Sequence, residues 1–229
     1  MKIDLTRIPN IVVIGLAVTL GIVIAVWLFL PRPSALSAEA LYRQAGRLIR
    51  TGDYPTAEQK LRQALEQRPN DARLHFALGR ALMGLKMPDE ALISFQQAIS
   101  LNPENRDYRF EAGVALLTGR REKIAEDIFR GLVQRYPRDL PALYQLGALQ
   151  SRRGRYAEAA ETFKIIVTQE PGEAEAWNNL GFCYYNLGRS EDALEAIGKA
   201  LSLKPDFDKA KTNREIIRQE SQAASPVPK

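Results

Sequence analysis

Residues 190–205 read SEDALEAIGKALSLKP, and residues 88–103 read PDEALISFQQAISLNP. The two stretches share alanines in their middle and a proline at their end, and they lie 102 residues apart, which is three times 34. The same 34-residue spacing runs through three series: Pro69, Pro103, Pro137, Pro171 and Pro205; Ala57, Ala91, Ala125, Ala159 and Ala193; and Ala45, Gly79, Gly113, Gly147 and Gly181. A fixed period of this length predicts a solenoid of stacked units.

Two helices are expected within each unit. In the last unit, Trp177, Leu180 and Tyr184 are spaced three and four apart, which gives one apolar stripe on a helix over 174–187. Gly188 is expected to follow as a C-terminal cap.

The second helix of that unit is expected to begin after Ser190, which can cap its N-terminus. Ala193, Ile197 and Ala200 form its inner stripe. Small residues at Gly181 and Ala193 would let the two helices cross closely. A single helix pair cannot bury both faces, so the units must stack.

These units resemble the tetratricopeptide repeat, whose consensus places Trp, Leu, Gly, Tyr, Ala, Phe, Ala and Pro at positions 4, 7, 8, 11, 20, 24, 27 and 32. Residues 174–207 match it at Trp177, Leu180, Gly181, Tyr184, Ala193, Ala200 and Pro205, and Ile197 replaces Phe. The resemblance extends without a gap over five repeats, at 38–71, 72–105, 106–139, 140–173 and 174–207.

The resemblance implies an all-α fold, a right-handed superhelical solenoid of five helix pairs. Residues 208–223 have helical propensity and are predicted to cap the last repeat, because a terminal repeat needs a polar outer face. Residues 224–229 are expected to form a flexible tail.

An uncharged stretch precedes the repeats. Residues 11–30 carry no charge over twenty positions, which is long enough to cross a bilayer as a helix. We expect a transmembrane anchor there, between a short tail at 1–10 and a linker at 31–37. A cleaved signal peptide is the alternative, although its apolar core would be shorter.

Ala17, Gly21 and Ala25 share one face of the expected anchor, and such small-residue faces let two membrane helices associate. A homodimer through this face is one hypothesis; a second is that small residues are simply common in membrane helices. We expect a single-pass protein of the bacterial inner membrane, with the repeats outside the cytoplasm.

The expected binding surface follows from the family, in which positions 2, 5, 9, 12 and 13 of the first helices commonly hold peptide ligands. Four of the five position-5 residues are aromatic, which suits an apolar helix or extended segment. The rings could instead be half buried against neighbouring helices. The predicted partner-binding groove comprises Tyr42, Phe76, Arg80, Met83, Phe110, Val114, Leu117, Tyr144, Ser151, Asn178, Phe182 and Tyr185.

Other classes of site have little support. The sequence shows no nucleophile–base pair, phosphate loop or metal-ligand spacing, so we expect no catalytic residue, no metal and no cofactor. His75 and Cys183 are the only histidine and cysteine, and both fall at packing positions. The net charge is only +5, and acidic residues balance most of the basic residues at the turns between paired helices, so nucleic acid is not expected as a partner.

The sequence therefore predicts a non-enzymatic, membrane-anchored scaffold or assembly factor. Its partner would be a protein, either a membrane protein or part of a membrane-associated complex. The alternative is a targeting receptor or co-chaperone that faces the cytoplasm.

Overall fold

The computed structural model describes residues 36–224, and its contacts divide the chain into two units, Met1–Ser37 and Ala38–Lys229. Between residues 36 and 224 there are eleven helices and no strand. They are α2 (Ala38–Thr51), α3 (Tyr54–Gln67), α4 (Ala72–Gly84), α5 (Pro88–Leu101), α6 (Arg106–Thr118), α7 (Glu122–Arg135), α8 (Leu140–Arg152), α9 (Tyr156–Gln169), α10 (Ala174–Asn186), α11 (Ser190–Leu203) and α12 (Asp208–Ala224).

The predicted anchor at 11–30 lies outside the described residues, and so does its proposed association face, Ala17, Gly21 and Ala25. None of the helices that the structure describes is both long and apolar enough to cross a membrane.

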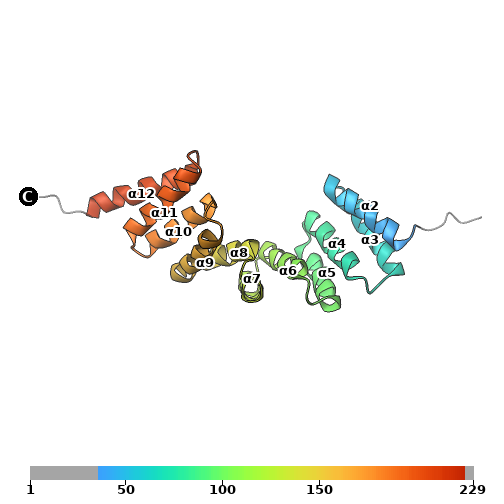
Figure 1. Ribbon diagram of the computed structural model, residues 1–229. Coiled ribbons are helices and arrows are strands. Elements are labelled where there is room, and N and C mark those ends of the chain that lie inside the picture. The colour runs from blue at the N-terminus through green and yellow to red at the C-terminus, as the bar shows by residue number, and fades with distance from the viewer. Residues whose placement is uncertain (1–35, 225–229) are drawn as a thin grey trace, which may run out of the picture. The chain divides into compact units, whose positions relative to one another are not determined.

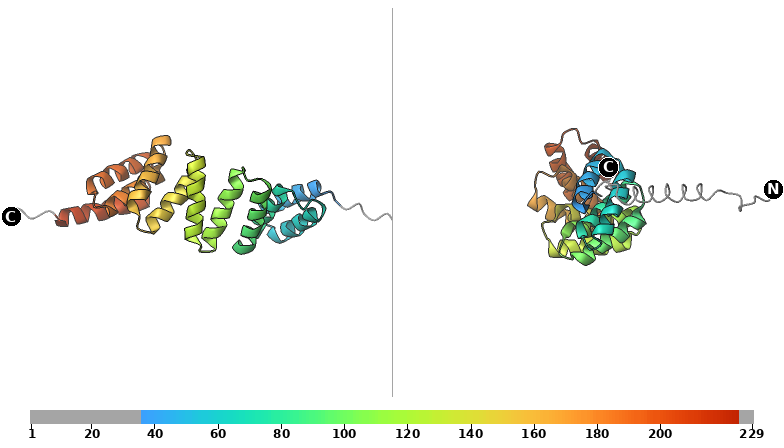
Figure 2. Two further views of the ribbon diagram at one scale, coloured as in Figure 1. Left: turned by 90° about the horizontal axis from the view of Figure 1, so that it is seen from below. Right: turned by 90° about the vertical axis from the view of Figure 1, so that its right-hand side faces the viewer.

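Consecutive helices form antiparallel pairs, and each pair packs on the next. Each first helix contacts its own second helix, and that second helix contacts the first helix of the following pair. Figure 1 and the left view of Figure 2 show this order from α2, in blue, to α12, in red. Helix α12 lies against α10 and α11, where the first helix of a sixth pair would lie. The predicted all-helical solenoid is confirmed.

A close crossing within each pair explains the glycine series. A Cβ added at Gly79 would come within 2.5 Å of the Phe95 ring, and one at Gly181 within 2.6 Å of Ile197. The glycines at 113 and 147 meet Phe129 and Phe163 in the same way. These phenylalanines are among the largest fully buried side chains of the described core. The predicted close approach at Gly181 is therefore confirmed.

The turn inside each pair has its own residue with a positive φ angle. Gly52, Gly154 and Gly188 have φ angles of 83°, 73° and 74°, and Lys86 and Arg120 have 63° and 59°. These five positions are also 34 residues apart. They end the first helices in the left-handed conformation, as expected for Gly188.

Helix N-termini differ from the expectation at Ser190. Ser190 is the first residue of α11, and Arg189 precedes it as the N-cap without a side-chain hydrogen bond. Among the second helices, α3 has a side-chain cap, because Asp53 accepts from the Thr56 N–H. Three of the first helices have one, where Asp71, Asn105 and Asp139 accept backbone N–H bonds. These residues close their repeats at position 34, so the cap of one helix pair belongs to the pair before it.

Polar side chains also link neighbouring repeats, and the linking residues differ from one junction to the next. The links between repeats are Arg73–Glu39 for the first and second, Arg121–Asp89 and Arg135–Glu104 for the second and third, and Arg153–Glu126 and Arg155–Glu126 for the third and fourth. Asn178–Asn213 joins the fifth repeat to α12, whereas Arg106–Asp139 and Tyr144–Glu173 each lie within one repeat.

Candidate functional site

The twelve predicted groove residues all lie on the first helices of their pairs, and we call this set the first-helix stripe. Their exposure is uneven. Arg80 and Phe182 are exposed, Asn178 is fully buried, and the other nine are half buried: Tyr42, Phe76, Met83, Phe110, Val114, Leu117, Tyr144, Ser151 and Tyr185. The stripe is therefore a surface of partly covered apolar groups.

The position-5 rings pack against the second helix of their own repeat. The ring centroid of Phe110 lies 5.6 Å from that of Phe129, and Tyr144 lies 6.3 Å from Phe163, both edge-to-face. Above Phe110, the guanidinium of Arg106 lies 4.7 Å from the ring centroid. The rings thus support the core as well as the surface, and only part of each ring is open to a ligand.

Asn178 makes a contact that the sequence did not suggest. Its Oδ1 accepts a hydrogen bond of 2.9 Å from Nδ2 of Asn213 on α12, and its own Nδ2 has no partner among the described residues. A cap helix thus covers this member of the predicted groove. The repeat pattern gave no sign of this, because α12 departs from the consensus.

A small cavity of about 270 Å³ lies beside that contact. Phe182, the most exposed aromatic ring of the predicted set, lines it together with Ser151 and Lys209. The ring of Phe182 packs edge-to-face against that of Tyr156, and the two ring centroids are 6.1 Å apart. This C-terminal part of the stripe offers one exposed ring beside polar groups.

A larger cavity, of about 530 Å³, lies at the other end of the stripe between α2 and α4. We call it the basic pocket. Tyr42 and Phe76 are half buried in its wall. The residues that line it are Tyr42, Arg43, Gly46, Arg47, Ile49, Arg50, Phe76, Ala77 and Arg80. The predicted set included Tyr42, Phe76 and Arg80, but not the arginines of α2.

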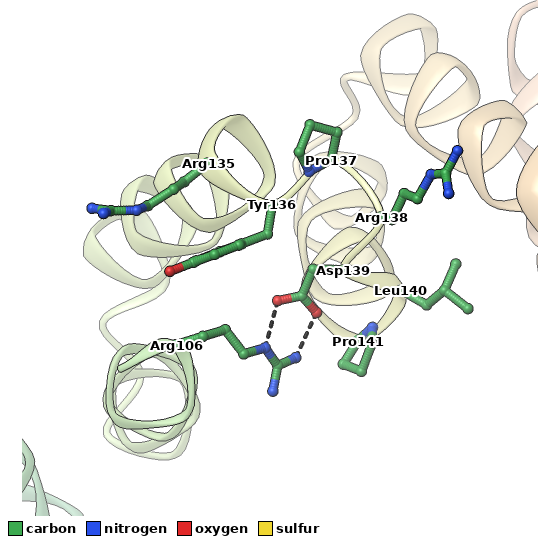
Figure 3. Close-up of a pocket in the computed structure, with 8 residues that line it drawn as sticks. All are labelled: Arg106, Arg135, Tyr136, Pro137, Arg138, Asp139, Leu140 and Pro141. Carbon is green, nitrogen blue, oxygen red and sulfur yellow. Dashed lines mark hydrogen bonds and ion pairs between the residues drawn. The ribbon is translucent and has the colours of Figure 1, made fainter. Parts of the chain in front are cut away.

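A third cavity, of about 820 Å³, lies around the turn between α7 and α8 (Figure 3). Arg106 crosses it to Asp139, with hydrogen bonds of 2.6 and 2.5 Å. Arg135 is paired with Glu104, and the hydroxyl of Tyr136 donates to the Glu104 carbonyl oxygen at 3.2 Å. Arg106, Arg135, Tyr136 and Asp139 are thus already engaged in contacts within the protein.

Some of the basic residues at the turns inside the pairs are also engaged in ion pairs. Arg121 pairs with Asp89, Arg152 with Glu122 and Arg189 with Asp192. Within residues 36–224, no group of His, Cys, Asp and Glu side chains is arranged to hold a metal ion.

The structure is a solenoid of repeated helix pairs that cross closely at glycines and carry a partly exposed first-helix stripe. Matches to protein families support the same class of protein. Residues 49–169 match the family described as cytochrome c-type biogenesis protein H TPR domain, and residues 174–207 match the tetratricopeptide repeat. The chain belongs to the tetratricopeptide repeat family, in the branch of the cytochrome c-type biogenesis protein H TPR domain.

Solved structures show the same fold. The crystal structure of YrrB, a TPR protein with an unusual peptide-binding site, is 26% identical with a TM-score of 0.68, and the match covers 78% of this chain and 92% of YrrB. MamA residues 41 to the end from Desulfovibrio magneticus RS-1 is 23% identical with a TM-score of 0.68, covering 75% of this chain and 97% of that one. No curated protein sequence matches the chain.

Proposed function

We propose that this protein is a non-enzymatic, membrane-anchored scaffold that holds a segment of a partner protein on its first-helix stripe. The observation that carries the proposal is the stripe itself. It keeps one exposed ring, at Phe182, and one cavity lined by both apolar and basic side chains, the basic pocket. Concave, partly apolar surfaces with a few polar groups are typical binding sites.

The family supports a role in the biogenesis of c-type cytochromes, because more than half of the chain matches that family's TPR domain. A peptide-binding relative of the same fold, YrrB, supports a protein segment as the ligand. On this proposal the solenoid presents one protein to another during assembly, and contributes no chemical step.

We also propose that residues 11–30 anchor the scaffold in the bacterial inner membrane, with the repeats outside the cytoplasm. An uncharged stretch of twenty residues supports this. A seven-residue linker would then keep the repeats within about 25 Å of the bilayer. Association of two chains through Ala17, Gly21 and Ala25 is compatible with this arrangement.

Topology separates this proposal from the cytoplasm-facing receptor. A reporter enzyme fused after Lys229 that is active only outside the cytoplasm supports the scaffold as proposed. Activity only inside the cytoplasm would favour the targeting receptor or co-chaperone.

In-cell photocrosslinking tests the stripe. A photoreactive amino acid replaces Phe182 in one strain and Ile93 in another. Both side chains are exposed, but Ile93 lies on the second helix α5, outside every described cavity named above. We expect a specific partner to be captured from position 182 and not from position 93. Equal capture from both positions would contradict the proposed binding surface.

Phe110 and Tyr144 are poorer sites for such a test, although the sequence favours them. Both rings pack on buried phenylalanines, so their truncation to alanine would also loosen the core.

A further inference from the structure

Four arginines line the basic pocket at the N-terminal end of the stripe, together with apolar side chains. Arg43, Arg47 and Arg50 come from α2 and Arg80 from α4, and all four are exposed. None of them forms an ion pair within residues 36–221. Guanidinium groups normally find carboxylates where geometry allows, and in the same two repeats Arg62 does so, with Glu58 at 2.8 Å.

The carboxylates near the basic pocket are already engaged or distant. Arg73 holds Asp71 at 2.8 Å and Glu39 at 3.4 Å. Glu111 interacts electrostatically with Arg80, which partly opposes the rise in its pKa caused by burial. No Asp or Glu lines the pocket among the residues described. The field inside it is therefore positive, chiefly from the three arginines of α2.

These three arginines form a column. Their spacing of four and then three residues places them on one face of α2, over about 10 Å of helix. Carboxylates of a helical segment recur with the same spacing, and those of an extended segment recur about every 7 Å. A protein segment can thus present several carboxylates to the column at once.

Beside the column, the pocket offers an apolar wall and open space. Tyr42, Ile49 and Phe76 are half buried there. A Cβ added at Gly46 would meet nothing within 4 Å, so the backbone of α2 is open to a ligand at that point. An apolar side chain of a bound segment could lie over Gly46 while neighbouring carboxylates reach the arginines.

We propose that the basic pocket binds an acidic, amphipathic segment of the partner protein. This inference rests on the proposed function and names the chemistry of the segment that the stripe holds. Guanidinium–carboxylate hydrogen bonds supply the charge recognition, and the aromatic wall distinguishes a protein segment from a bare anion. An anionic lipid headgroup has the negative charge, but it has no apolar group beside that charge to lie over Gly46.

The test is fluorescence anisotropy on the full-length protein with synthetic probes. The first probe is a capped 14-residue peptide that carries leucines on one helical face and glutamates on the other. The second has glutamine in place of every glutamate. We expect the glutamate peptide to bind at least about tenfold more tightly, and its affinity to fall as salt rises.

Two variants locate the binding. Arg43→Gln with Arg47→Gln removes half of the cationic cluster, and Gly46→Phe fills the open space. Each is expected to weaken binding of the glutamate peptide by about tenfold or more. The matched controls are Arg138→Gln with Arg218→Gln, which removes the same charge elsewhere, and Gly198→Phe on α11, where an added Cβ also meets nothing within 4 Å. The controls should bind as the wild type does.

Three results would overturn the inference: equal binding of the two peptides, equal effects of the variants and their controls, or displacement by dihexanoylphosphatidylglycerol with no preference for the glutamate peptide. The last would assign the pocket to lipid headgroups.

The proposed function has its own test: capture of a partner from position 182 that persists in the Arg43→Gln, Arg47→Gln variant would retain the scaffold and reject the acidic segment.

Discussion

The indole nitrogen of Trp177 donates a hydrogen bond of 2.9 Å to the carbonyl oxygen of Pro171, in the turn before its helix. His75 Nε2 lies 2.7 Å from the Pro69 carbonyl oxygen, and Arg109 donates to that of Pro103 at 2.9 Å. The side chain at the consensus tryptophan position therefore makes a polar contact in addition to its packing. It supplies a donor to a carbonyl that follows the end of the preceding helix pair, where backbone acceptors lack helical partners.

Removing that donor tests its contribution. Trp177→Phe keeps an aromatic ring but loses the N–H, and we expect the free energy of unfolding to fall by about 1 kcal/mol or somewhat more from lost ring area. Urea unfolding followed by circular dichroism measures it. Tyr184→Phe is the control on the same helix, because that hydroxyl makes no hydrogen bond within residues 36–224; it should change stability by less than about 0.5 kcal/mol. Equal losses would contradict the role of the indole donor.

Two glycines in helices should respond oppositely to alanine. Gly79→Ala places a Cβ about 2.5 Å from the buried Phe95 ring, and overpacking costs about 1–3 kcal/mol, against at most about 1 kcal/mol gained in helix propensity. Gly131→Ala meets nothing within 4 Å and should stabilise α7 by about 0.5–1 kcal/mol. Thermal unfolding of both variants checks the signs. A stabilised Gly79→Ala would mean that the pair can separate freely.

Glu126 predicts a pH dependence. Its side chain is nearly buried and accepts from Arg155, from Arg153 at 2.9 Å and from Arg130 at 2.5 Å. The Arg155 hydrogen bond lowers the pKa of the Glu126 carboxyl below its usual value. Because the folded pKa is below the unfolded one, this carboxylate stabilises the fold fully above about pH 4.3, and the stabilisation is lost as pH falls through the folded pKa.

Glu126→Gln should therefore destabilise the protein most at neutral pH. We expect a loss of about 2 kcal/mol at pH 7, less than for a fully buried pair because the arginines are partly exposed, and a smaller loss at pH 3. Urea unfolding at both pH values measures the difference. Glu161→Gln, at an exposed residue without an ion pair within 36–224, should show neither effect. A loss that is the same at both pH values would contradict the assignment to the charged carboxylate.

Cys183 should react slowly while the protein is folded. The thiol is fully buried, and burial raises its pKa to about 11, so almost no thiolate is present at pH 8. Iodoacetamide labelling, read by mass spectrometry, should be much faster in urea than in buffer. Labelling at equal rates would show that α10 opens readily or that the thiol is accessible.

The repeat pattern predicted the helix pairs and their crossings because those depend on one residue per position. Gly181 needs only a small side chain at the crossing, and the period shows that directly. The prediction that Ser190 caps the second helix was wrong. Gly188 forms the turn and Arg189 occupies the N-cap position, so Ser190 is already the first residue of α11.

The candidate stripe was predicted less completely. Tyr144 lies at the border between core and surface, where its ring packs against Phe163 on another helix, and a sequence does not show how much of the ring that contact covers. The contact of Asn178 with Asn213 joins residues on helices that share no consensus position. The arginines of α2, which form no ion pair within residues 36–221, were missed because a sequence lists charges but does not show which of them contact carboxylates.

The polar links between the first four repeats differ from one junction to the next: Arg73–Glu39, then Arg135–Glu104, then Arg153–Glu126. Exchanging two repeats would keep every consensus residue and still break these links. The chain thus carries a fixed order of modules. A shuffled version would fold as isolated blocks with poorly joined seams, so the basic pocket and the exposed Phe182 stay at a constant spacing only in the natural arrangement.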